Sequence, residues 1–315
     1  MKDTVQEMTT GETTTSIAGF NSVVTGVVGK VWIKEIIDAA KKKMFFEQFA
    51  YVVDAPQGAK DVAVPLYTSN LDFTVTTTEA TARTMTVIDN LSTVVFTPST
   101  QKMGVTVSSD VIRTSQIDVI RFAREQLVYD TALNLDGAFV TVLDAAATNA
   151  KLYGPARNNR AALVAGDILT TDLIAKMNRI LKAQGWYPES DKPFVLFIAP
   201  QQEEALLKDS QFVNAAEYGS NEIVMNGEIG KYLGIKVIST CQMTAFTDGG
   251  GSTYAGHIVY LLKSRVSYGL VYGQKPKLDF EYEKDLAAYK IYLDICYQAK
   301  LLQGSAVQVL EVLDA

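Results

Sequence analysis

Residues 76–112 read TTTEATARTMTVIDNLSTVVFTPSTQKMGVTVSSDVI, and this stretch decides how the chain is divided. Its first half is rich in threonine, and β-branched residues of this kind favour an extended backbone. The segment TVTTTEATARTMT (74–86) is polar on both faces, so neither face suits burial against a core of the same domain. We therefore expect a two-stranded ribbon that projects into solvent or lies on another subunit, with a register that its own side chains fix only weakly.

The second half of the stretch leads through an expected strand at Val105–Val107 into a long helix. Ser109 and Asp110 offer side-chain oxygens that can cap its first turn. Helical periodicity continues to about Ala147. Toward the C-terminal end, a single face carries Ala132, Leu135, Ala138, Phe139 and Val142. A helix over 110–147 would be about 50 Å long, far longer than the usual globular helix, so the pattern indicates an elongated molecule.

The rest of the chain mixes helices and strands, which predicts the α+β class. Helices are expected at 31–49, 169–184, 201–208 and 210–218. Strands are expected at 61–64, 73–76, 194–199, 235–239, 258–262 and 266–272. Periodicity alone leaves DLAAYKIYLDICYQAKL (285–301) open between strand and helix, and its aromatic and β-branched content favours strand, as it does for AVQVLEV (306–312).

Composition excludes several classes of protein. The formal net charge is −6, so the chain lacks the bulk positive charge that binds nucleic acid phosphates without sequence specificity. The N-terminal residues lack the apolar core of a signal peptide. The longest apolar run, Phe194–Ala199, is far shorter than the roughly 20 residues of a membrane-spanning helix. Cys241 and Cys296 are expected to be buried free thiols, so we expect an intracellular protein with no membrane partner.

No group of residues has the spacing of a catalytic or metal-binding motif. The single histidine, His257, lies in an apolar strand context and is expected to be structural or exposed. Asp248 precedes three glycines, but one carboxylate on a flexible loop is a weak cation site. Without paired titratable groups, the sequence predicts no catalytic residue, no cofactor and no metal.

Three closely spaced glycines, Gly227, Gly230 and Gly234, precede the strand expected at 235–239. Glycines at this density either let the backbone approach a ligand or form tight corners. Their spacing differs from the dinucleotide fingerprint, and they follow a polar loop instead of a strand. We expect structural turns, and a ligand-binding loop stays open as the alternative.

Three stretches together resemble the major capsid proteins of tailed bacteriophages with the HK97-type fold, in particular the branch related to phage N4. They are residues 76–112, FVNAAEYGSNEIVMNGEIGKYLGIKVISTCQM (212–243) and AGHIVYLLKSRVSYGLV (255–271), and the resemblance extends from about Trp32 to the end. It implies an α+β fold with an N-terminal arm, an extended β-hairpin called the E-loop, a peripheral lobe with a long spine helix, and an axial α/β lobe.

The resemblance also implies a division of the chain. The N-terminal arm and first helix take residues 1–50, the E-loop with its flanking strands 51–109, the spine helix and its connection 110–164, the axial lobe 165–263, and the return strands of the peripheral lobe 264–315. The E-loop itself spans about 57–98, with its tip near 78–89. The candidate subunit contacts on it are Phe73, Val75, Glu79, Arg83, Met85 and Val87.

The function implied by the resemblance is that of a structural major capsid protein and not of an enzyme. Copies would assemble as pentamers and hexamers into an icosahedral shell around double-stranded DNA, which they contact without sequence specificity. A scaffolding protein, a portal and a decoration protein are the further partners. The protein would reside in the virion, after assembly in the cytoplasm of a bacterial host. An encapsulin-like nanocompartment with the same fold and a soluble α+β enzyme remain alternatives.

Overall fold

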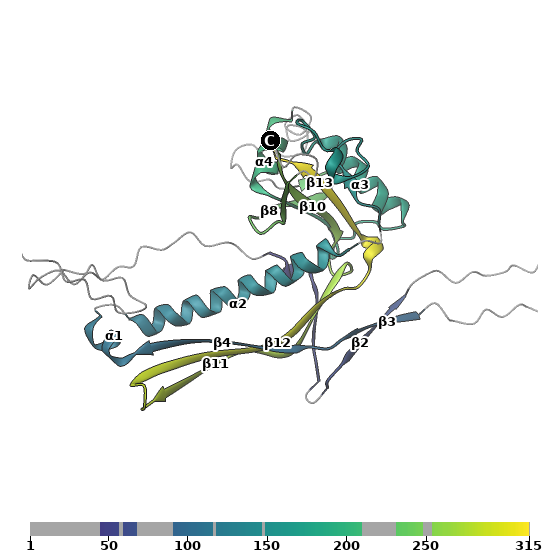
Figure 1. The fold of residues 1–315 in the computed structure, drawn as a ribbon. Coiled ribbons are helices and arrows are strands. Elements are labelled where there is room, and N and C mark those ends of the chain that lie inside the picture. The colour runs from purple at the N-terminus through teal and green to yellow at the C-terminus, as the bar shows by residue number, and fades with distance from the viewer. Residues whose placement is uncertain are drawn as a thin grey trace, which may run out of the picture.

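The structure, a computed structural model, describes residues 45–56, 59–67, 91–115, 118–146, 149–209, 231–247 and 254–314. They form a four-stranded sheet, a seven-stranded sheet and a two-stranded ribbon (Figure 1). A long helix, α2 (Val119–Asp144), lies along the four-stranded sheet. Two shorter helices, α3 (Thr171–Ala183) and α4 (Pro200–Lys208), accompany the seven-stranded sheet. The α+β class expected from the sequence is confirmed.

The four-stranded sheet has the order β1 (Tyr51–Asp54), β11 (Tyr268–Glu283), β12 (Ala288–Leu301) and β4 (Ser99–Ser108). β1 runs parallel to β11, and the other neighbours are antiparallel. β12 alternates buried and half-buried residues, as a sheet with one covered face requires. Its buried set joins α2 in one hydrophobic cluster and comprises Ile291, Leu293, Ile295 and Tyr297. The strand favoured over helix for 285–301 is therefore confirmed along most of its length.

The long helix is interrupted, so the single helix expected over 110–147 is wrong. A short helix, α1 (Ser109–Thr114), ends where Ser115 adopts an extended conformation, and α2 begins after Asp118, whose carboxylate accepts from the Arg121 N–H at 3.0 Å. This cap fixes a new helix start within what reads as continuous periodicity. Ser108, one residue earlier than expected, caps α1. The buried stripe of α2 is centred on Leu127, Thr131, Leu135, Phe139 and Leu143.

The seven-stranded sheet joins strands from distant parts of the chain. Its order is β5 (Leu152–Tyr153), β13 (Val307–Leu313), β10 (Ala255–Lys263), β6 (Phe194–Ile198), β8 (Ile235–Ser239) and β7 (Lys231–Tyr232), and β9 (Ala245–Thr247) pairs with β10. β6 is buried throughout because both faces of the sheet are covered. Phe194, Leu196 and Ile198 pack in the cluster that contains α3, whereas Val195 and Phe197 pack in the cluster that contains α2.

The last strand departs from the expected division of the chain. Residues 264–315 are expected to return to the lobe of the spine helix, but β13 pairs antiparallel with β10 and parallel with β5 in the larger sheet. All seven residues of β13 are buried, so the strand needs a sheet that is covered on both sides. Its polar residues find partners there. Gln308 Nε2 donates to the Ala150 carbonyl at 2.9 Å, and the Glu311 carboxylate accepts from Arg160 at 2.6 and 2.8 Å.

Residues 45–50 join the two sheets. Phe46 stacks on Phe197 of β6 with ring centroids 4.4 Å apart, and its carbonyl accepts from the Tyr268 hydroxyl of β11 at 2.6 Å. A short 3-10 helix, η1 (Glu47–Phe49), follows. The helix expected over 31–49 lies outside the described residues except for this end. The same is true of the helix expected at 210–218 and the strand expected at 73–76.

The remaining elements are two short 3-10 helices, η2 (Arg160–Ala162) and η3 (Gly304–Ala306). Within the described ranges, no helix combines the length and the hydropathy needed to cross a membrane.

Candidate assembly surfaces

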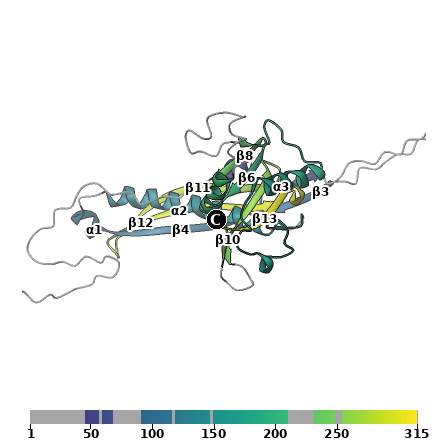
Figure 2. The same ribbon diagram turned by 90° about the horizontal axis from the view of Figure 1, so that it is seen from above.

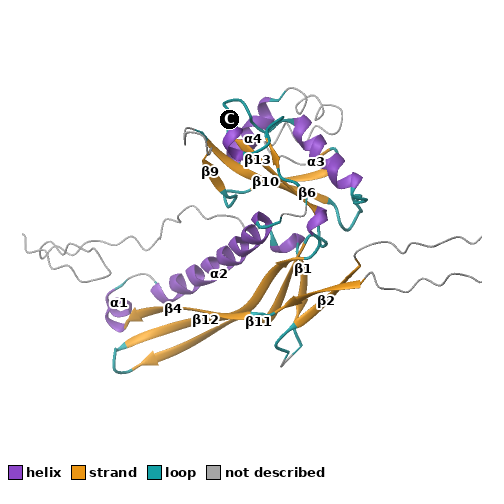
Figure 3. Ribbon diagram, turned by 45° about the vertical axis from the view of Figure 1, so that its right-hand side comes forward, coloured by secondary structure: helices purple, strands orange, loops and turns teal. Residues whose placement is uncertain are grey.

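The ribbon consists of β2 (Val62–Tyr67) and β3 (Leu91–Phe96), which leave the four-stranded sheet at the end opposite to α1 (Figures 1 and 3). They pair antiparallel from Val62↔Phe96 to Tyr67↔Leu91. One face of the ribbon packs on Val271 and Leu302 through Val62, Val64, Leu66, Val94 and Phe96. The base of the ribbon is therefore part of the subunit's own core.

The opposite face of the ribbon is open to solvent and partly apolar. Tyr67 is 50% exposed, Leu91 is 61% exposed and Val95 is 45% exposed. Pro65 also lies on this face, and a proline is tolerated in a strand mainly where the strand has a free edge. Large apolar side chains gathered on one exposed face are typical of surfaces that contact another molecule.

The ribbon is tied to the end of β12 by polar contacts. Lys300 Nζ donates to the Val95 carbonyl at 2.8 Å, and the Thr97 N–H donates to Gln298 Oε1 at 2.6 Å. Gln303 Nε2 donates to the Tyr67 carbonyl at 3.1 Å. These contacts hold the two strands of the ribbon against the end of β12.

Most site residues expected from the sequence lie outside the described residues. They are Phe73, Val75, Glu79, Arg83, Met85, Val87, Gly227 and Gly230. Gly234 is described and lies with Leu233 in the two-residue turn that joins β7 to β8. The φ angles are 50° at Leu233 and 77° at Gly234. Two positive φ angles characterise the hairpin turn whose twist matches the flanking strands, so glycine suits this position.

A second exposed surface lies at the far end of the four-stranded sheet, beside α1, on the face that α2 covers elsewhere. It consists of Phe122, Phe280, Tyr282, Leu286 and Tyr289, which are between 38% and 60% exposed. Phe280 faces Ile291, and Tyr282 faces Tyr289 with ring centroids 4.8 Å apart. The sequence holds a signal for this surface, because DFEYE (279–283) alternates acidic and aromatic residues as a strand with one apolar face does.

The other face of the same strands is charged and internally neutralised. Lys102, Asp294 and Lys277 lie in register across β4, β12 and β11. Lys277 Nζ also pairs with Asp279 at 2.8 Å, and Lys290 pairs with Glu283. Charges that neutralise each other in this way are typical of a surface that is in contact with solvent. At this end of the sheet, the apolar face is therefore better suited to contact another molecule than the charged face.

Where the two sheets meet, Asp136 of α2 is buried and holds two other segments. Its Oδ2 accepts from the Phe45 N–H at 3.0 Å and from Gln242 Nε2 at 3.2 Å. Burial disfavours the charged carboxylate and raises its pKa to about 6, against the opposing effect of these hydrogen bonds. Asp136 thus connects the start of the described chain, the long helix and the connection after β8.

The C-terminal end of α2 makes a second polar contact to the larger sheet. The Tyr260 hydroxyl donates to Asp144, and Thr244 Oγ1 donates to the same carboxylate at 2.7 Å. Burial, followed by the neighbouring carboxylate, raises the pKa of Tyr260. The tyrosine therefore stays neutral and serves as a donor. Its role is structural, since it orients the sheet on the helix.

The described residues offer little support for catalysis or metal binding. His257 Nδ1 lies 2.8 Å from Asp314 Oδ1, which ties β10 to the end of the chain. No group of three or more His, Cys, Asp or Glu among the described residues could hold a metal. Both cysteines are free, but Cys241 is exposed and Cys296 half-buried, so the expectation of two buried thiols is wrong. Cys241 lies in the turn after β8, outside the sheet that would cover it.

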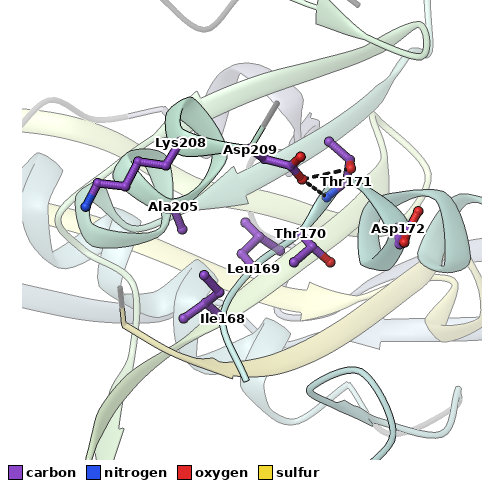
Figure 4. Close-up of a pocket in the computed structure, with 8 residues that line it drawn as sticks. All are labelled: Ile168, Leu169, Thr170, Thr171, Asp172, Ala205, Lys208 and Asp209. Atoms are coloured by element: carbon purple, nitrogen blue, oxygen red, sulfur yellow. Dashed lines mark hydrogen bonds between the residues drawn. The ribbon is translucent and has the colours of Figure 1, made fainter. Parts of the chain in front are cut away.

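A depression between α3 and α4 has a volume of about 340 Å³ (Figure 4). Its floor is apolar, with Ile168, Leu169 and Ala205. Asp209 lines it, but its Oδ2 accepts from the Thr171 N–H at 3.0 Å and from Thr171 Oγ1 at 2.8 Å, so this carboxylate caps α3. The hydroxyl of Thr171 and the carboxylate of Asp209 are thus engaged in a helix cap at the rim of the depression.

Comparison with protein families and solved structures gives one consistent result. A family model described as phage capsid protein matches residues 91–296. A search of curated proteins found no match. Among solved structures, the capsid of Ralstonia phage GP4 is similar with a TM-score of 0.67 at 16% identity, over 96% of this chain and 98% of that chain.

Two cyanophage capsids are similar to a comparable extent. The capsid of cyanophage P-SCSP1u matches with a TM-score of 0.69 at 16% identity, over 95% of this chain and 97% of that chain. The capsid of cyanophage Pam1 matches with a TM-score of 0.67 at 15% identity, over 94% and 99% of the two chains. At such identities the likeness concerns the fold, and it confirms the capsid fold that the sequence implied.

Proposed function

The chain belongs to the phage capsid protein family, and from this premise we propose that many copies of it assemble into an icosahedral shell that encloses double-stranded DNA. The protein is thus a structural, shell-forming major capsid protein. The observation that carries the proposal is a ribbon whose base is anchored in the subunit and whose other face is exposed and partly apolar. The sequence between its strands is polar on both faces of an expected strand over 74–86. Such a segment becomes buried only against another copy.

The proposed contact is heterologous, because the ribbon of one copy lies on a different surface of the next. Contacts of this kind close into rings around a symmetry axis. The same contact gives pentamers where five copies complete the ring and hexamers where six copies do. Each contact is modest, but each subunit makes several of them, and the effective concentration within a ring raises the stability of the whole shell. In the sequence between β2 and β3, the proposed contact residues are Phe73, Val75, Glu79, Arg83, Met85 and Val87.

The finer assignments follow from the same proposal. A scaffolding protein, a portal and a decoration protein are proposed as partners, and assembly is proposed to take place in the host bacterial cytoplasm before the protein becomes part of the virion. The proposal also includes membership of the branch related to phage N4 and the lobe boundaries at 50, 109, 164 and 263. β13 is the exception to this division, because it pairs in the larger sheet. The net charge of −6 supports loose contact with packaged DNA, because the protein lacks bulk attraction to phosphates.

We also propose that the subunit has no catalytic activity. The depression between α3 and α4 supports this, because its carboxylate at Asp209 is engaged as a helix cap. The chain's single histidine supports it as well, because His257 is paired with Asp314. Both groups have structural explanations.

The test is assembly of the full chain after expression in bacteria, with ribbon variants of matched size. Phe73→Ser, Val75→Ser, Met85→Ser and Val87→Ser together should abolish particles in negative-stain electron microscopy, because they remove the apolar side chains of the contact. The matched control changes Thr74, Thr76, Thr84 and Thr86 to Ser and should retain particles. A parent chain that elutes as a monomer or small oligomer contradicts the proposal and favours a soluble protein. Particles from phage-infected cells that protect protein instead of DNA favour a nanocompartment.

A further inference from the structure

Three segments that lie far apart in the sequence meet at one buried carboxylate, that of Asp136. The C-terminal half of α2, which carries it, runs beneath the seven-stranded sheet (Figures 1 and 2). Asp136 is 1% exposed. Its Oδ2 accepts from the Phe45 N–H at 3.0 Å and from Gln242 Nε2 at 3.2 Å, and the Phe46 N–H is a further donor. One side chain thus joins α2 to the segment that precedes η1 and to the connection that follows β8.

Both of these segments are attached to the larger sheet. The ring of Phe46 stacks on that of Phe197 in β6. In the connection after β8, the Thr240 N–H donates to the Ile198 carbonyl of β6 at 2.9 Å. The contacts to Asp136 therefore help to hold the larger sheet on the long helix.

The groups that face Asp136 do not compensate a negative charge. Its donors are neutral, since two are backbone N–H groups and the third is the side-chain amide of Gln242. Glu47 of η1 is a second carboxylate, and its charge opposes the ionisation of Asp136. From β11, Tyr268 faces the same site, and burial, followed by the charge of Asp136, raises its pKa well above the usual value. A carboxylate buried among neutral donors, with a like charge nearby, is disfavoured in its charged form.

Ionisation of Asp136 therefore works against the closed junction. Burial raises its pKa to about 6, whereas the ordinary value of 3.8 applies where water reaches the carboxyl group. The closed junction is thus favoured most below about pH 4, and this advantage is lost as the pH rises through 6. A difference of about two pKa units changes the ratio of open to closed junctions by up to about 100-fold.

We propose that Asp136 is a switch that loosens the junction between the two sheets when its carboxyl group ionises. In mild acid, the neutral side chain keeps residues 45–46 and the connection after β8 closed on α2. At neutral pH, the charged carboxylate gains more from water than from its neutral donors, so these two segments open more often while the strands of each sheet stay paired. The switch belongs to the subunit itself and does not rest on the proposed assembly into a shell.

Hydrogen exchange of the full chain, measured by mass spectrometry and corrected for the intrinsic effect of pH on exchange, tests the proposal. The readout is the protection of residues 45–50 and 240–244, with β6 as the internal reference. Protection of both segments should fall by about tenfold or more from about pH 4.5 to about pH 7.5, and that of β6 should fall less. In Asp136→Asn, which keeps an acceptor oxygen but cannot ionise, protection should be equal at the two pH values.

Two further variants locate the titrating group. Glu47→Gln removes the neighbouring charge and keeps an acceptor for the Tyr272 hydroxyl, which donates to Glu47 Oε1 at 2.7 Å. It should move the midpoint of the transition to lower pH, because Glu47 opposes the ionisation of Asp136. Asp144→Asn is the matched control, since Asp144 also lies on α2 and accepts from Thr244 Oγ1 of the same connection at 2.7 Å. It should retain the pH dependence of the parent.

Each outcome decides for or against the switch. Constant protection of both segments in the parent over this pH range overturns the proposal. An equal loss of protection in the parent and in Asp136→Asn also overturns it, because the titrating group then lies elsewhere. If Asp136→Asn does not fold, Glu47→Gln decides, since a midpoint shifted to lower pH supports the proposal and an unchanged midpoint overturns it.

Discussion

The junction between the two sheets and the outer rim formed by the ribbon and β4 use similar residues in opposite ways. At the junction, Phe46 and Phe197 are fully buried, and the carboxylate of Asp136 has two donors. On the rim, Tyr67 and Leu91 are at least half exposed, and the edge of β4 has no strand partner within the described ranges. The difference indicates that the stability of the subunit and its capacity to associate reside in separate residues.

The largest expected effect separates these two regions by stability. Phe197→Ala should lower the free energy of unfolding by about 3–5 kcal/mol, because it removes a fully buried ring that stacks on Phe46. Tyr67→Ala, on the exposed face of the ribbon, should change it by about 0.5 kcal/mol or less. Urea unfolding of unassembled subunits measures both. Equal losses of unfolding free energy in the two variants would contradict the conclusion that stability and association reside in separate residues.

A smaller effect concerns the pH dependence of the junction. The pKa of Asp136 is about 6 in the folded protein against an ordinary value of 3.8, so the fold favours the neutral acid. The corresponding stabilisation is complete below about pH 4 and is lost as the pH rises through 6. Two pKa units correspond to about 3 kcal/mol as an upper limit. The stability of Asp136→Asn relative to the parent should therefore rise by up to that amount from pH 4 to pH 8.

The control for this titration is Asp285→Asn, in the exposed turn between β11 and β12. Its side chain is exposed, so this substitution removes a carboxylate without changing a buried site. Unfolding in urea at several pH values gives both curves. A flat curve for Asp136→Asn would show that this carboxylate is not held in a buried environment.

The smallest effect compares two glycines with opposite backbone requirements. Gly234 has a φ of 77°, a region that side chains with a Cβ rarely adopt, so Gly234→Ala should destabilise the subunit by about 1 kcal/mol. Gly137 lies exposed within α2, and a Cβ added there meets no atom within 4 Å. Gly137→Ala should therefore stabilise the subunit by about 0.5–1 kcal/mol. Thermal unfolding gives the sign of each stability change. The same sign for both variants would contradict the turn conformation assigned to Gly234.

Local patterns in the sequence predicted the elements whose residues determine their own conformation. The strand at 235–239 has the predicted bounds, and the strand over 194–199 ends one residue early. The break between α1 and α2 was missed, because it depends on one side chain, Asp118, that accepts from a backbone N–H three residues later. Hydrophobic periodicity does not distinguish a continuous helix from two helices separated by such a cap.

Features that depend on distant partners could not be read from the sequence. The partners of Asp136 are Phe45 and Gln242, which lie far away along the chain, so its burial has no local signal. Glu311 reads as a reason against a buried strand until Arg160 is placed beside it. The contact residues expected between β2 and β3 stay a prediction, because they lie outside the described residues.

The most direct test of the central claim, that residues 68–90 act on a neighbouring copy, is to remove them without disturbing the subunit. Tyr67 and Leu91 are directly paired, so an Asn-Gly turn can replace the segment and keep β2 and β3 in register. Analytical ultracentrifugation of the shortened and full chains gives their masses. We expect megadalton particles for the full chain and a folded monomer with unchanged thermal stability for the shortened one. Particles of the same mass and yield from the shortened chain would contradict the claim.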